Sequence, residues 1–163
     1  MSVTHASDRQ RSVQYLVAAF SLIAGLIHLW VTPEHFEEWW GYGTFFLVAA
    51  VAQVVYVPLL VRWPNQTVLL LGIAGNSAIV LLYLFTRVVG VPLFGPEAGE
   101  VEGVGIIDVC ATASEAAIVV ALGVLLLWRL AGERTTLIGL IVSAMLLVVA
   151  HLPHVLLLLL ALL

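Results

Sequence analysis

Long apolar runs alternate with short polar segments along almost the whole chain. Each run has about the 20 residues that a helix needs to cross the hydrocarbon core of a bilayer. Glycine, proline and charged residues separate the runs, because these residues end helices where the chain meets water. The pattern predicts an all-α polytopic membrane protein, a bundle of five transmembrane helices. The expected spans are residues 13–31, 43–62, 67–86, 104–130 and 135–162.

The first apolar run follows two arginines, as the hydrophobic part of a secretory signal peptide also does. The run is longer than that part usually is, and His28 and Trp30 stand where small residues would mark a cleavage site. We therefore expect a retained first span. Acidic and aromatic residues then predict a short interfacial helix at about 33–40, opened by Pro33 with Thr32 as its N-cap.

The composition leaves no room for a soluble module. Of the 163 residues, 63% are hydrophobic and 10% are charged, whereas soluble domains have about 25% charged residues. The whole chain, 1–163, is therefore expected to form a single transmembrane domain. All six basic residues are arginines and the net charge is −4, which argues against a nucleic-acid partner. The single cysteine excludes an internal disulfide and a C-x-x-C metal or redox site.

The arginines predict the orientation of the chain in the membrane. All but Arg87 lie before the first span, between spans 2 and 3, or between spans 4 and 5, and these segments share one side. The positive-inside rule makes that side cytoplasmic. We expect an integral protein of the plasma (inner) membrane, with its N-terminus inside and its C-terminus outside. The arginines of the cytoplasmic side are Arg9, Arg11, Arg62, Arg129 and Arg134.

Polar residues inside the spans are the candidates for function. A charged side chain at the bilayer centre costs about 2.5–3.5 kcal/mol on insertion scales, so such residues face the protein interior and are usually functional. At a rise of about 1.5 Å per residue, four of them fall near the middle of spans 2 to 5. Others lie nearer the predicted outer side. Asp108 and Thr112 of this outer group share one helix face with Glu115 of the middle layer. The middle layer is Gln53, Asn76, Glu115 and His151, and the outer group includes His28, Asp108 and His154.

The histidines predict a metal site. His151 and His154 are three residues apart on one helix face, and neutral imidazole is a common ligand of zinc, copper and iron. Together with His28 and Glu115 they would supply three imidazoles and a carboxylate. A haem held by His28 and one histidine of span 5 is a variant of the same hypothesis. The sequence does not choose among copper, zinc, iron and haem.

Further polar residues are expected to support these ligands or to line the entrance to the site. The entrance should face the extracytoplasmic side, where most of the carboxylates lie. Arg87 is the one basic residue of that side, and it either extends toward the headgroups or pairs with Asp108 or a loop carboxylate. The supporting and entrance residues are His35, Glu38, Glu34, Asp108, Arg87, Asn76 and Gln53.

These residues support three hypotheses, each for a different class of function. The first is the metal or haem site, with a redox or metal-handling role. The second is a proton- or cation-coupled transporter or channel that uses Glu115 and Asp108. Against it, the inner halves of the spans carry almost no polar residue below Gln53 and Asn76. The third is an accessory subunit of a larger membrane complex, in which a neutral Glu115 only joins helices by hydrogen bonds.

The sequence leaves the remaining questions open. It contains no motif that identifies a catalytic residue, so it does not decide whether the protein is an enzyme. The lipid bilayer is the expected surrounding. A membrane-protein partner and a second copy of the chain both remain open as further partners.

Overall fold

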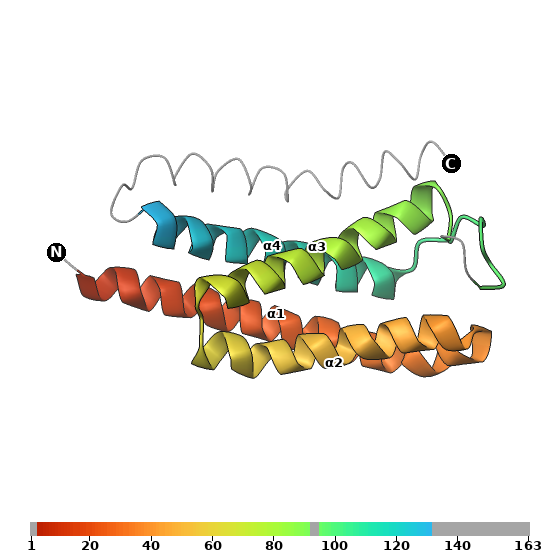
Figure 1. Cartoon of the computed structure of the whole chain (residues 1–163), viewed down its shortest axis with the longest axis horizontal. Coiled ribbons are helices and arrows are strands. Elements are labelled where there is room, and N and C mark those ends of the chain that lie inside the picture. Colours follow the sequence, from red (N-terminus) through yellow and green to blue (C-terminus); the bar gives the residue numbers. More distant parts are fainter. Residues whose placement is uncertain (1–2, 92–94, 132–163) are drawn as a thin grey trace.

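The computed structural model describes residues 3–91 and 95–131, and these residues form four long helices (Figure 1). Each of the four is long and apolar enough to cross a membrane. Apart from one bridge between Val91 and Ala98, the described residues contain no β-structure. The all-helical character of a membrane protein is thus confirmed for this part of the chain. The helices are α1 (Val3–Glu38), α2 (Trp40–Arg62), α3 (Gln66–Val88) and α4 (Ile106–Ala131).

These helices correspond to the first four predicted spans. The fifth predicted span, 135–162, lies outside the described residues, and His151 and His154 lie there with it. The count of five helices, the place of the C-terminus and the orientation in the membrane therefore stay predictions.

The end of α1 differs from the sequence-based expectation. Residues 33–38 do not begin a separate helix but form the last turns of α1, with Pro33 inside the helix. The hydroxyl of Thr32 donates to the carbonyl oxygen of His28 at 2.7 Å, a bond back along the helix, so Thr32 does not act as an N-cap. The helix breaks instead at Trp39, which is extended (φ −166°, ψ 138°) and precedes α2.

Helices α1 and α2 run side by side, whereas α2 and α3 separate from each other along their length (Figure 1). A Cβ atom on Gly25 would lie 3.2 Å from the carbonyl oxygen of Ala50, so glycine lets the backbones of α1 and α2 approach closely. Near their connecting turn, α2 and α3 are joined by the Tyr56 hydroxyl, which donates to the Val68 carbonyl at 3.0 Å. Beyond this contact the two helices diverge toward Trp40 and Val88.

The two ends of the bundle differ in charge. The beginning of α1, the α2–α3 turn and the end of α4 lie at one end (Figure 1). This end holds four of the five arginines assigned to the cytoplasmic side, and Arg134 lies outside the described residues. The opposite end holds the end of α1, the beginning of α2 and the loop from α3 to α4, and we call it the acidic end because Glu34, Glu37, Glu38, Glu97, Glu100 and Glu102 lie there.

A closely packed apolar core fills the arginine-rich half of the bundle. Five large side chains, contributed by all four helices, are fully buried there. Each helix also carries a buried polar residue further from the arginine-rich end: His28 on α1, Gln53 on α2, Asn76 on α3 and Glu115 on α4. The five apolar side chains lie between these polar residues and the arginine-rich end. We call this set the apolar plug: Val17 on α1, Leu60 on α2, Leu69 on α3, and Ile118 and Leu122 on α4.

Candidate functional site

Four polar side chains, one from each helix, meet above the apolar plug. Nε2 of His28 lies 2.8 Å from Oε1 of Glu115, and Gln53 donates to the same carboxylate oxygen at 3.0 Å. The Gln53 amide also donates to Oδ1 of Asn76 at 3.4 Å. The exposed fraction is 4% for His28 and 1% for Glu115, so the pair is withdrawn from solvent. We call His28, Gln53, Asn76 and Glu115 the polar network.

Two further hydrogen bonds to backbone carbonyls hold the helices and side chains of the polar network in place. The Ser21 hydroxyl donates to the backbone carbonyl of Gln53 at 2.9 Å, and the Asn76 amide donates to the carbonyl of Gly72 at 2.8 Å. Within the part of the chain that the structure describes, Nδ1 of His28 and Oε1 of Gln53 are buried without a hydrogen-bond partner. The network therefore has remaining hydrogen-bonding capacity, which is unusual for buried polar atoms.

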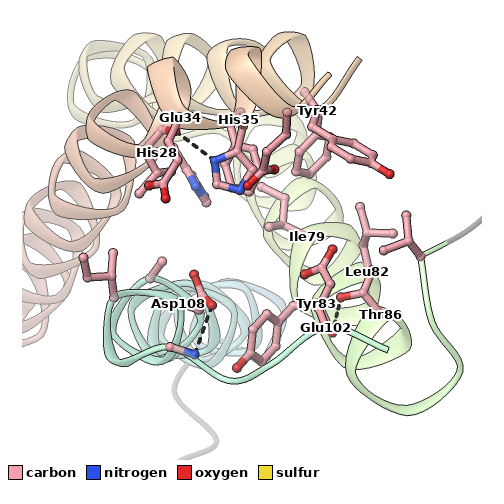
Figure 2. Close-up of a pocket in the computed structure, with 18 of the residues that line it drawn as sticks. His28, Glu34, His35, Tyr42, Ile79, Leu82, Tyr83, Thr86, Glu102 and Asp108 are labelled. Atoms are coloured by element: carbon pink, nitrogen blue, oxygen red, sulfur yellow. Dashed lines mark hydrogen bonds between the residues drawn. The ribbon is translucent and has the colours of Figure 1, made fainter. Parts of the chain in front are cut away.

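A cavity of about 1030 Å³ opens above the network, toward the acidic end. Small-molecule sites commonly have volumes of about 300–1,000 Å³, so this space accommodates a drug-sized molecule. Figure 2 shows His28 and His35 on one side of the cavity and Asp108 on the other, with Tyr83, Thr86 and Glu102 along its edge. All four helices and the loop from α3 to α4 contribute to the lining.

The two histidines of α1 that line the cavity, His28 and His35, lie against one aromatic ring. The ring centre of Phe46 lies 3.9 Å from that of His35 and 5.5 Å from that of His28. Nδ1 of His35 lies 2.8 Å from the carbonyl oxygen of Val31. Because a carbonyl only accepts, this Nδ1 carries the proton, and Nε2 of a neutral His35 is left as an acceptor on the cavity side.

Arg87 lies at the edge of the cavity between two carboxylates. Its guanidinium donates to Oδ2 of Asp108 at 2.9 Å and also forms a hydrogen-bonded ion pair with Glu102. The same group lies over the ring of Tyr83, 4.6 Å from the ring centre, and donates to the Thr86 hydroxyl at 2.9 Å. Of the two alternatives that the sequence left open for Arg87, the structure shows the pairing, and the partners are both Asp108 and the loop carboxylate Glu102.

The charged lining of the cavity is strongly acidic. Among the described residues that line it, Arg87 is the one lysine or arginine, and its charge is already paired. Carboxylates come from α1, from the loop and from α4. They are Glu34, Glu38, Glu97, Glu102, Asp108 and Glu115.

The structure brings together some of the predicted site residues and separates others. His28 and Glu115 are in direct contact, but Asp108 pairs with Arg87 instead of joining them. His35, Glu34 and Glu38 line the cavity, and their role as supporting or entrance residues stays a prediction. Gln53 and Asn76 belong to the polar network.

The described residues do not test the prediction of a metal site. In residues 3–91 and 95–131, no group of three or more histidine, cysteine, aspartate or glutamate side chains is arranged to hold a metal ion. His151 and His154, the other two predicted ligands, lie outside the described residues. Copper, zinc, iron or haem as a cofactor therefore stays a prediction.

Several lining residues were not identified from the sequence. Phe46 and Tyr83 stand in apolar runs, where an aromatic residue most often belongs to the core or faces lipid. Glu97 and Glu102 lie in the loop from α3 to α4, from which the sequence predicted only that some carboxylate could pair with Arg87. The positive φ angles of Gly90, Gly95 and Gly99 shape this loop so that Glu102 reaches Arg87, and such a path has no simple sequence signal.

No family model, no curated protein and no solved structure matches this chain. The cavity and the polar network are therefore the features that bear on function.

Proposed function

We propose that this protein binds an organic cation with an apolar body in the cavity between its helices. The observation that supports this proposal is the charge of the cavity lining: six carboxylates against one arginine. A cleft lined by one sign of charge with low-dielectric walls concentrates counter-ions of the opposite sign. The ligand that fits such a lining is a cation.

The exposed carboxylates lie where a ligand would enter. Glu34 and Glu38 are exposed at the end of α1, and neither forms an ion pair within the described residues. Glu102 and Asp108 are paired with Arg87, and Glu115 accepts from His28 and Gln53 deeper inside. The entrance therefore carries the uncompensated negative charge. An anionic ligand, such as a haem with two propionates, would be repelled there.

The walls of the cavity suit an apolar body. Phe45, Phe46, Ile79 and Leu82 line the space between α2 and α3. Aromatic faces also attract cations, by about 0.5–2 kcal/mol for each contact. Arg87 already makes such a contact with Tyr83. A molecule with an apolar body and a positive group would thus find a complementary surface for both parts.

The apolar plug favours a binding site over an open conduit. Val17, Leu60 and Ile118 are fully buried on the far side of the polar network, where the cavity ends. A charged ligand that reached the network would face apolar side chains in its further path. A transporter that uses Glu115 and Asp108 would have to open this plug, and that role stays a prediction.

Two size-matched ions of opposite charge test the proposal. With the protein in lipid nanodiscs, tetraphenylphosphonium is expected to bind at least about tenfold more tightly than tetraphenylborate, because the two ions differ in charge and hardly in shape. Equilibrium dialysis against empty nanodiscs measures both affinities. Equal binding of the two ions, or no binding of the cation, would show that the proposal is wrong.

The contribution of the entrance carboxylates has a matched control. The double variant Glu34→Gln/Glu38→Gln is expected to weaken tetraphenylphosphonium binding by about tenfold, since two charges near the site are lost. The control is Glu37→Gln/Glu100→Gln, which removes the same charge from exposed residues outside the cavity lining. An equal loss in both variants would mean that the effect is one of net charge and not of the cavity.

A further inference from the structure

We propose that Arg87 limits the ligand to a single positive charge, because its guanidinium occupies a second cation site within the same cavity. The inference rests on the proposed function and names a determinant of its specificity. Arg87, Tyr83, Glu102 and Asp108 all line the cavity.

The groups around the Arg87 guanidinium are of the kind that form a binding site for an organic cation. Two carboxylates accept from the two terminal nitrogens of the guanidinium, one on each. The Tyr83 ring lies 4.6 Å below the guanidinium carbon and supplies an aromatic face. Charge-assisted hydrogen bonds together with a cation–π contact are the interactions by which proteins bind guanidinium and ammonium groups. The chain fills this site with its own side chain.

The carboxylates of this site can be reached from the cavity. The exposed fraction of the side chain is 35% for Glu102 and 34% for Asp108, whereas it is 12% for Arg87. The carboxylates therefore remain available to a second positive group if the guanidinium is removed. In the wild-type protein, the guanidinium fills the place between the two carboxylates. A second positive group on a ligand would therefore lose its water without finding a free partner there.

Removing the charge of Arg87 should change the selectivity of the cavity in a defined direction. The change Arg87→Met keeps a long apolar side chain and leaves Glu102 and Asp108 without their counter-ion. A ligand with two positive groups could then place one of them beside Tyr83. A ligand with one positive group would gain little, because it already has the carboxylates of the entrance.

The experiment compares straight-chain primary alkylammonium ions with the matching α,ω-alkanediammonium ions, in their hexyl, octyl and decyl forms, because their N–H groups can donate to Glu102 and Asp108 as the guanidinium does. Within each pair the chain is the same and only the second charge differs. The wild-type protein in nanodiscs should bind the single-charged member more tightly. In Arg87→Met, affinity for at least one double-charged member should rise by about tenfold or more, with a change below about threefold for its partner. Arg87→Lys, which keeps the charge, should retain the wild-type order.

A purely structural role of Arg87 gives a different result. If Arg87 only fastens the loop to α3 and α4, Arg87→Met would lose affinity for both members of each pair, or for neither, and the inference would be overturned. If Arg87→Met is too unstable to purify, Arg87→Gln retains two hydrogen-bond donors without the charge. In that variant the double-charged ion should raise the melting temperature more than its single-charged partner, and an equal rise would overturn the inference. If the wild-type protein binds none of these ions, the proposed function is wrong, and the inference fails with it.

Discussion

Replacement of Glu115 by alanine is expected to destabilise the helix bundle by about 3–5 kcal/mol, the range seen when one partner of a buried ion pair is removed. Glu115 is 1% exposed and accepts hydrogen bonds from His28 and Gln53, which come from two other helices. Without the carboxylate, Nε2 of His28 would stay buried with no acceptor, and the Gln53 amide would keep only its 3.4 Å hydrogen bond to Asn76. The free energy of unfolding, measured by detergent titration in mixed micelles, checks this expectation.

Two variants provide controls for Glu115→Ala. Glu115→Gln keeps an acceptor oxygen at the same place, so its loss should be smaller, about 1–2 kcal/mol. Ser114→Ala removes a neighbouring hydroxyl whose one hydrogen bond within the described residues goes to the Cys110 carbonyl on its own helix, and it should cost about 1 kcal/mol or less. If Glu115→Ala lost no more stability than Glu115→Gln, the network would not be joining the helices.

The second large effect is expected from valine at Gly72. A Cβ atom there would collide with the Tyr56 hydroxyl and with the side chain of Leu122, so the added side chain would push α3 away from α2 and α4. Overpacking of this kind costs about 1–3 kcal/mol. The displacement would also break the hydrogen bond from Tyr56 to Val68. The same unfolding measurement applies.

Gly75 supplies the matched control on the same helix. Among the residues that the structure describes, a Cβ atom at this position would meet nothing within 4 Å. Gly75→Val makes the same chemical change, with the same effect on helix propensity, three residues further along α3. It should be close to neutral. Equal losses at Gly72 and Gly75 would mean that the collision with Tyr56 and Leu122 does not determine the result, since valine is the better helix former of the two residues exchanged.

The helices themselves were predictable because of their apolar length. A run of about 20 apolar residues can satisfy its backbone groups in a bilayer only as a helix or in a closed barrel, so hydropathy is nearly sufficient for α1 to α4. The end of α1 was not predictable in the same way. Pro33 in the sequence predicts the start of a helix. A proline is also tolerated inside a membrane helix when neighbouring groups bond the backbone carbonyl that the proline leaves without a donor. Here Pro33 lies inside α1, and Thr32 bonds to the His28 carbonyl of the same helix.

Depth along a helix was also predictable, whereas rotation about its axis was not. Counting residues placed Gln53, Asn76 and Glu115 at one level, and the structure joins them by hydrogen bonds. The same count placed His28 nearer the outer side, and the sequence grouped it with Glu115 only as ligands of one metal ion, not as a directly hydrogen-bonded pair. Which side chains meet across helices depends on helix tilt and on close approaches such as that at Gly25, and these are properties of the packed bundle.

The apolar plug has an electrical consequence. Glu115 lies nine residues after the first residue of α4, which is about 14 Å along the helix axis, or nearly half of the roughly 30 Å hydrocarbon thickness. The cavity ends at Glu115, and the apolar plug lies beyond it. Most of a transmembrane potential would therefore fall across the polar network and the apolar plug. A monovalent cation that enters to this depth would cross part of that potential, where a complete crossing is worth about 2.3 kcal/mol per 100 mV. Its affinity should therefore vary with membrane voltage even if it never passes through the protein.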